Sequence, residues 1–174
     1  VTIPSSVTNI GEFAFCDCSG LTSVTIPSSV TNIGRSAFTN CKGLKSVTIL
    51  SSVASIDTSA FSSCKAIAEL KVQSIEDWCK VILKEDSAHP FAVSTVSTPK
   101  LVAGGKEITE LVIPSTITEI CDYTFWKNMG LTSVTFPSSG TSIGNSAFRY
   151  CSGLTSVTIP SSVTNIGEFA FCDC

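Results

Sequence analysis

Nine cysteines and a single histidine carry the most reactive side chains in this chain of 174 residues. The pairs Cys16-x-Cys18 and Cys172-x-Cys174 are spaced like half of a zinc site. A structural zinc ion takes four ligands, and the complementary half is missing because His89 is the only histidine. Structural thiols are therefore favoured over disulfides, and disulfides over metal binding. We predict no metal ligand.

The segment Asp86-Ser87-Ala88-His89 places an acid, a hydroxyl and an imidazole within four residues. A catalytic triad needs these groups to converge in space, whereas neighbours in one loop rarely do so. We therefore expect an exposed loop before Pro90 and no catalytic residue. The chain also lacks a glycine-rich phosphate loop and a metal set, so we predict a non-enzymatic protein without a cofactor.

Composition narrows the classes of partner. Charged residues make up 14% of the chain, and 11 Lys and Arg against 14 Asp and Glu give a net charge of −3. Nucleic-acid binding would need a basic stripe, so no nucleic-acid partner is expected. No apolar run reaches the ~20 residues of a membrane span, and no signal peptide is visible at the first residues.

The elements that position these residues repeat every 23 residues. Residues 1–18 and 157–174 are identical, and Leu21, Leu44, Leu131 and Leu154 begin nearly identical units. A fixed period of this length predicts a solenoid, because a single unit cannot bury its apolar face without its neighbours. Positions below are counted within the repeat, with Leu21 as position 1.

Each repeat position has an expected role. The alternation Val24-Thr25-Ile26 predicts a short strand, and residues 30–33 predict a second extended piece. Glycine at position 14, as in Gly34, predicts a turn with a positive φ, and a second glycine at position 23 closes the unit. The Ala37-Phe38 pair predicts a short helical turn with the phenylalanine pointing inward. The Cys that recurs at position 21, as in Cys41, is expected to face the core as a small apolar thiol.

This unit, L-x-x-V-x-I-P-x-x-V-x-x-I-G-x-x-A-F-x-x-C-x-G, resembles the leucine-rich repeat of the BspA-like surface proteins. The resemblance implies an α/β repeat solenoid, a right-handed leucine-rich-repeat superhelix that is strand-rich, with short helical turns and one helical insert. It also implies a protein that is surface-exposed or secreted and associated with adhesion. The family has no shared catalytic residues to transfer.

We expect one leucine-rich-repeat domain over residues 1–174. Its regular repeats are expected at 1–20, 21–43, 44–66, 108–130, 131–153 and 154–174. Between them lies an irregular stretch, 67–107, with an insert at 73–107. Both ends look cut within a unit, so the chain reads as an excerpt of a longer array. Uncapped ends predict possible head-to-tail self-association between copies.

The insert at 73–107 has its own pattern. Ser74 looks like a helix N-cap, and Ile75, Trp78, Cys79 and Ile82 share one face of a helix. Residues 101–103, Gly104-Gly105 and residues 108–113 look like a hairpin with a glycine turn. Two interpretations stay open: the helix covers the solenoid with Trp78 buried, or the insert contacts a ligand.

The outward positions 3 and 5 are mostly Ser and Thr, a solvated face poor in binding anchors. That ladder is interrupted by charges at Glu69, Lys71 and Glu110, which we take as candidate ligand contacts. Trp126 is a fourth candidate, exposed as an anchor or, equally, packed beneath the insert. The favoured function is an extracellular or cell-surface adhesin-like module that binds a host or matrix protein, or a glycan. The alternative is a passive rod that spaces another domain.

Overall fold

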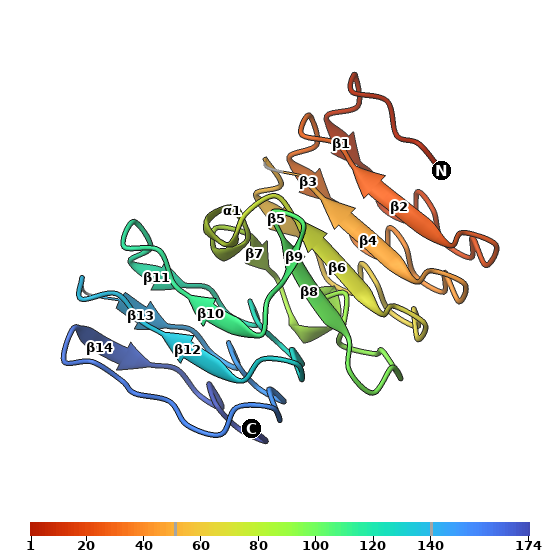
Figure 1. Ribbon diagram of the computed structural model, residues 1–174. Helices are drawn as coiled ribbons and strands as arrows, with labels where there is room; N and C mark the ends of the chain where they lie inside the picture. Colours follow the sequence, from red (N-terminus) through yellow and green to blue (C-terminus); the bar gives the residue numbers. More distant parts are fainter. Residues whose placement is uncertain (51, 140) are drawn as a thin grey trace.

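The chain winds into a strand-rich solenoid whose coils stack side by side (Figure 1). The computed structural model describes residues 1–50, 52–139 and 141–174. Its coils fall into two stacks that we call the N-terminal stack, residues 1–107, and the C-terminal stack, residues 108–174. Within each stack, parallel strands form two narrow sheets on opposite sides of a shared core.

Four sheets make up the two stacks. The larger N-terminal sheet contains β2 (Ser23–Ile26), β4 (Ser46–Ile49), β6 (Glu69–Val72), β8 (Lys100–Ala103) and β9 (Lys106–Glu107). Its companion contains β1 (Asn9–Ile10), β3 (Asn32–Ile33), β5 (Ser55–Ile56) and β7 (Ile82–Leu83). The C-terminal stack pairs β10 (Glu110–Val112) with β12 (Ser133–Thr135), and joins β11 (Glu119–Ile120), β13 (Thr141–Ile143) and β14 (Val163–Ile166).

The core follows the repeat, as predicted. In the coil that starts at Leu44, every apolar repeat position is buried: Leu44, Val47, Ile49, Val53, Ile56, Phe61 and Cys64. Because neighbouring coils match in register, identical side chains stack into ladders. The rings of Phe15 and Phe38 are 5.1 Å apart and nearly parallel, and those of Phe38 and Phe61 are 5.3 Å apart.

The cysteines at position 21 face inward, as predicted, at Cys41, Cys64 and Cys151, whereas Cys18 and Cys174 in the two end coils are exposed. The buried thiols donate to a backbone carbonyl of the preceding coil: Cys64 Sγ lies 3.0 Å from Phe38 O, and Cys151 Sγ lies 3.2 Å from Phe125 O. Burial raises the pKa of Cys64 to about 12. These groups are therefore neutral thiols that act as small, weakly polar core residues.

The predicted helical turn around Ala37-Phe38 is wrong. The segment is a chain of tight turns in which Ser36 and Asn40 have φ values of 52° and 63°. Backbone N–H groups alternate in direction: Thr39 N donates back to Ser36 O, whereas Phe38 N donates across to Ala60 O of the next coil. Half of the bonds therefore join adjacent coils, which a helix would not allow.

The role predicted for glycine at position 14 is also wrong, because only Gly104 and Gly105 are glycines with positive φ among the described residues. A Cβ on Gly34 would instead lie 2.9 Å from the backbone of the preceding coil, at Ile10 O. Glycine there permits close approach of two backbones. Cys121 stands at the same position in the first coil of the C-terminal stack, whose strand β11 pairs only with the coil that follows.

Coil stacking gives a testable pair of variants at position 23. A Cβ on Gly153 would lie 2.4 Å from Met129 O, whereas a Cβ on Gly130 would meet nothing within 4 Å. We expect Gly153→Ala to lower the free energy of unfolding by about 1–3 kcal/mol through overpacking. Gly130→Ala is the matched control and should change it by less than about 0.5 kcal/mol. Equal denaturant midpoints for the two variants would contradict this account of the stacking.

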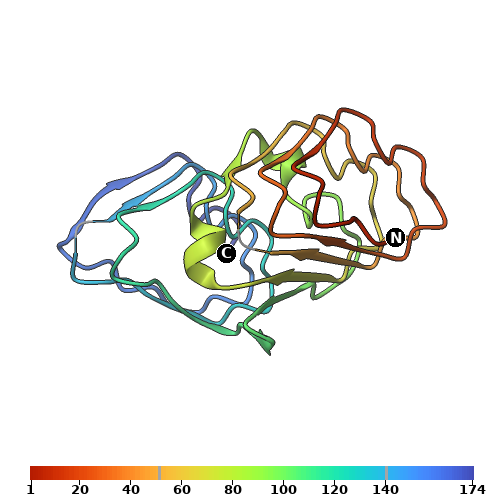
Figure 2. The same ribbon diagram turned by 90° about the horizontal axis from the view of Figure 1, so that it is seen from above.

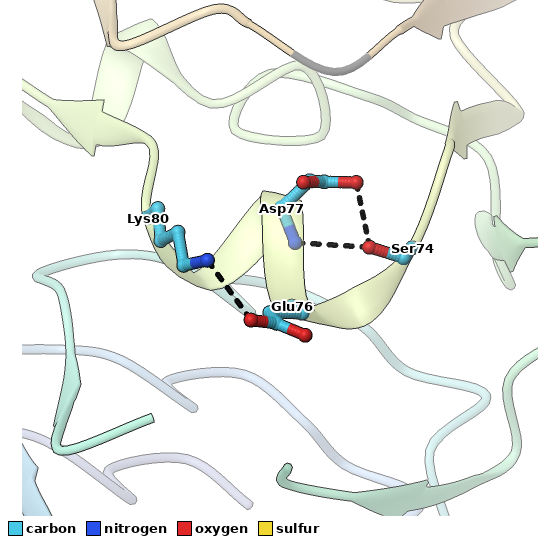
Figure 3. A network of polar contacts seen from close by, with 4 residues as sticks. All are labelled: Ser74, Glu76, Asp77 and Lys80. Atoms are coloured by element: carbon cyan, nitrogen blue, oxygen red, sulfur yellow. Dashed lines mark hydrogen bonds and ion pairs between the residues drawn. The ribbon is translucent and has the colours of Figure 1, made fainter. Parts of the chain in front are cut away.

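Helix α1 (Ile75–Cys79) lies where the insert helix is predicted, and Ser74 is its N-cap. Ser74 Oγ accepts from Asp77 N at 3.0 Å and donates to the Asp77 carboxylate, while Lys80 pairs with Glu76 at 3.0 Å (Figure 3). The prediction fails at Ile82. That residue lies in strand β7 rather than on the helix, and half of its surface is exposed.

The predicted glycine hairpin is present but shorter than expected. Gly104 and Gly105 have φ values of 55° and 80°, and they join β8 to the antiparallel β9, which spans only two residues. The residues expected to complete the second strand form β10 instead, which pairs with β12 in a separate sheet. The hairpin therefore ends the N-terminal sheet.

Side chains from the insert join the two stacks. Helix α1 lies between them in the view from above (Figure 2). Trp78 is 1% exposed, and its indole Nε1 donates to Thr124 O of the C-terminal stack at 2.7 Å. Lys127 reaches back from that stack to Ser94 O. The expected burial of Trp78 is therefore confirmed, and it leaves contact between the rest of the insert and a ligand as a prediction.

Candidate functional site

The glycine hairpin and the strands beside it form a hollow of about 740 Å³ on the described surface. We call it the hairpin pocket. Its floor comes from the outward face of β6 and β8, and one wall comes from the β8–β9 turn. The residues that line it are Thr48, Glu69, Lys71, Val72, Gln73, Lys100, Val102, Gly104, Gly105 and Glu107.

Two ion pairs hold the charged side chains of the hairpin pocket. Lys71 Nζ lies 2.9 Å from Glu69 Oε2, which also accepts a hydrogen bond from Ser46 Oγ at 3.1 Å. Lys100 Nζ lies 2.9 Å from Glu107 Oε2, and this hydrogen bond raises the pKa of Lys100. The pocket therefore presents two positive and two negative groups, all partly open to water. Such exposed pairs contribute little to stability.

Strand register explains why the charges gather here. Glu69 and Lys71 occupy positions 3 and 5, which hold Ser46 and Thr48 one coil earlier. On the other side, Glu69 faces Lys100 of β8. The structure thus brings the candidates Glu69 and Lys71 together. Glu110 is exposed on β10, in the other stack, and it does not line this hollow.

Lys100 and Glu107 were not among the predicted site residues. Both belong to the irregular stretch, where the count of 23 fails, so the repeat could not place Lys100 opposite Glu69. The feature of the sequence that could have indicated these two residues was the glycine pair. A two-residue turn at Gly104-Gly105 brings the flanking residues of both strands onto one surface.

Trp126 is buried, which contradicts the expectation of an exposed anchor. Only 5% of its surface is exposed. Its ring lies edge-on to Tyr123 and Tyr150, at 5.7 and 5.3 Å, and the Arg149 guanidinium sits 5.4 Å from its centroid. Ala92 of the insert lines the same small hollow as Trp126. Trp126 is therefore held by side chains of the C-terminal stack, and only this hollow lies between it and the insert residue Ala92.

The acid, hydroxyl and imidazole of residues 86–89 do not converge. Ser87 Oγ donates to the Glu85 carboxylate within a short 3-10 helix, Asp86–Ala88. His89 is fully buried between the rings of Trp78 and Phe91, and its Nδ1 accepts from Phe91 N at 3.0 Å. The expectation of an exposed loop is therefore wrong at His89, because this segment fills the core beside α1. Burial lowers the pKa of His89 to about 3.

Metal-binding groups and membrane-spanning helices are two further features to consider among the described residues. No group of three or more His, Cys, Asp or Glu side chains there is arranged to hold a metal ion. The helices within residues 1–50, 52–139 and 141–174 are all too short or too polar to cross a bilayer.

Solved structures of bacterial leucine-rich repeat proteins share this fold. A leucine-rich repeat protein from Bacteroides ovatus is 28% identical, with a TM-score of 0.62, over 99% of this chain and 42% of that protein. The T. pallidum leucine-rich repeat protein is 23% identical, also with a TM-score of 0.62, over 100% of this chain and 75% of that one. The chain thus spans less than half of the first. No curated protein sequence is significantly similar.

The repeat itself decides the family. Six copies of the BspA type leucine-rich repeat region cover residues 1–82 and 102–174. Only residues 83–101 fall outside, a stretch that runs from the last residue of β7 to the second residue of β8. The match covers far more than half of the sequence and includes helix α1. The chain belongs to the BspA-type leucine-rich repeat family.

Proposed function

We propose that the chain is a non-enzymatic binding module, displayed on the cell surface or secreted, that attaches to an extracellular matrix protein through the hairpin pocket. The observation that carries this proposal is the interruption of a neutral Ser and Thr ladder by a hollow with four charged groups. The family resemblance to BspA-like surface proteins supports the surface location and the adhesive role.

The chemistry of the pocket favours a protein over a glycan. Each of the two ion pairs offers a donor next to an acceptor: Lys71 with Glu69, and Lys100 with Glu107. The acid precedes the lysine along the chain in the first pair and follows it in the second. A protein surface with interspersed charges can exchange partners with both pairs, which gives specificity and fast association. Half-buried Val102 on β8 adds an apolar contact within the pocket. The pocket lining has no aromatic ring against which a sugar ring would pack.

The test compares two double variants by biolayer interferometry against immobilised fibronectin, fibrinogen, collagen and laminin, with a glycan array in parallel. Lys71→Gln with Glu69→Gln removes an ion pair of the hairpin pocket. Lys80→Gln with Glu76→Gln is the matched control, because it removes an exposed pair at 3.0 Å on α1 with the same change in charge. We expect the first variant to weaken protein binding at least about tenfold, as for loss of ~1.4 kcal/mol, and the control to bind normally.

Equal binding by both variants would place the site elsewhere on the chain. Binding to glycans alone would replace the protein ligand with a carbohydrate. If the parent chain bound neither the immobilised proteins nor the glycan array, the chain would be better explained as a passive rod that spaces another domain. Most of its outward positions are uncharged Ser and Thr, which suits such a rod.

A further inference from the structure

Two of the nine cysteines stand apart from the repeat. The other seven occupy positions 19 and 21: Cys16, Cys18, Cys41, Cys64, Cys151, Cys172 and Cys174. Cys79 is the last residue of α1, and Cys121 follows β11 directly, at a position where four other coils have glycine. Nothing in the repeat requires a cysteine at either place, so another cause for their presence is needed.

The fold brings these two residues to one hollow between the stacks. The cavity, of about 290 Å³, is lined on one side by Cys79, Lys80 and Ile82, and on the other by residues 116–119 and Cys121. Figure 2 shows α1 between the two stacks, where this hollow lies. Cys79 is 1% exposed, whereas Cys121 is partly open to water. One thiol is therefore accessible and the other is sheltered behind it.

The two thiols also differ from the core cysteines in their bonding. The thiols of Cys41, Cys64, Cys151 and Cys174 each donate to a carbonyl of the coil before. By contrast, the thiol groups of Cys79 and Cys121 make no hydrogen bond to another residue within the described ranges, although the Cys121 carbonyl accepts from Thr124 Oγ1 at 2.8 Å. Burial is the main cause that raises the pKa of Cys79, to about 12, and the charge of Cys121 is the next.

We propose that Cys79 and Cys121 form a disulfide that fastens helix α1 to the first coil of the C-terminal stack. This proposal rests on the surface or secreted location proposed above, but not on ligand binding by the hairpin pocket. Disulfides are expected in proteins outside the cell, where free thiols are unusual. The remaining cysteines can stay reduced in the same environment, because four of them are engaged in the core ladder described above.

The chemistry needs a small disulfide as oxidant, such as oxidised glutathione. The Cys121 thiolate attacks one sulfur of the oxidant, which releases one thiol and leaves a mixed disulfide on Cys121. The Cys79 thiolate then attacks the Cys121 sulfur and releases the second thiol. Two protein S–H bonds are lost, one S–S bond is formed, and the oxidant is reduced to two thiols. Burial raises the pKa of both cysteines, so the reaction should accelerate as the pH rises toward 9.

The test treats the folded chain with oxidised glutathione at pH 8.5, alkylates the remaining thiols, and maps tryptic peptides by mass spectrometry. Cys79 falls alone in peptide 72–80 and Cys121 alone in peptide 107–127, so a link between them is unambiguous. We expect these two peptides to be joined, and the thermal midpoint of the oxidised chain to rise by several degrees. Cys121→Ser should abolish both effects, whereas Cys16→Ser should leave both unchanged.

Two results would overturn the proposal. One is oxidation that leaves Cys79 and Cys121 alkylated, or that pairs Cys121 with another cysteine. The other is a cross-link that forms no faster in the folded chain than in urea, since proximity in the fold would then contribute nothing.

Discussion

Replacing Trp78 with alanine should lower the free energy of unfolding by about 3–5 kcal/mol, the range for removing a large buried aromatic side chain. Trp78 is among the largest fully buried side chains, and it lies beside His89 and beneath the C-terminal stack. The substitution leaves a cavity at the junction and removes the indole N–H that donates to the Thr124 carbonyl. Urea unfolding followed by far-UV circular dichroism measures the loss.

The variant Trp78→Phe separates packing from hydrogen bonding. It keeps most of the ring but removes the indole N–H that donates to Thr124 O at 2.7 Å. A buried acceptor left without a donor costs about 1–3 kcal/mol, so this variant should fall between the parent and Trp78→Ala. If both variants unfolded at the same denaturant concentration as the parent, Trp78 would not couple the insert to the C-terminal stack.

Acid should destabilise the fold through His89 well before most carboxylates titrate. The imidazole is fully buried, and its pKa falls to about 3 from an ordinary value of 6.5. The unfolded chain therefore binds a proton between these pH values that the folded chain does not bind. The stabilisation by neutral His89 is complete above pH 6.5 and is lost progressively as the pH falls toward 3, by about 5 kcal/mol in total.

His89→Asn isolates this contribution. The asparagine side chain cannot titrate, yet its Oδ1 can still accept the hydrogen bond from Phe91 N that His89 Nδ1 accepts now. Urea unfolding of both proteins at pH 7.5, 6.5, 5.5 and 4.5 gives two stability curves. Their difference should change by about 1.4 kcal/mol per pH unit below pH 6. Parallel curves would show that His89 is hydrated in the folded state.

The repeat predicted what depends on side-chain pattern. Leu44, Val47 and Phe61 are core residues because their positions recur in every coil, and stacking aligns them. The same 23-residue period predicted that Ser46 and Thr48 face outward on β4. Position 21 likewise predicted a buried thiol at Cys41 and Cys64.

The side-chain pattern of the repeat could not predict the backbone conformation of the turns. Ser36 and Tyr123 share position 16 with φ near 52° and 62°, although neither residue type favours the left-handed region. What holds them there is bonding between coils: Ser36 N donates to Thr58 O, and Tyr123 N to Asn145 O. A single repeat read in isolation has no such partner, so a helical turn was the natural but wrong prediction.

The candidate site was only half predictable for a related reason. Glu69 and Lys71 broke a visible Ser and Thr ladder, so composition alone marked them. Lys100 and Glu107 depend on how far the insert shifts the register, which no count of 23 provides. His89 was misplaced because its burial depends on packing within the insert, where the repeat is interrupted. The burial of Trp126 was left open because it depends on Tyr123, Tyr150 and Arg149, which stand at variable repeat positions.

The short strand β9 has a mechanical consequence. It ends the N-terminal sheet, and in the described ranges no strand pair joins the two stacks. Among the residues that the structure describes, the one main-chain hydrogen bond that crosses between the stacks joins Ile108 N to Leu101 O at the connection itself. Tension along the solenoid axis is therefore borne at this point by a few side chains, including Trp78 and Lys127. Under a stretching force the two stacks should separate from each other first, while the strand pairing within each stack stays intact.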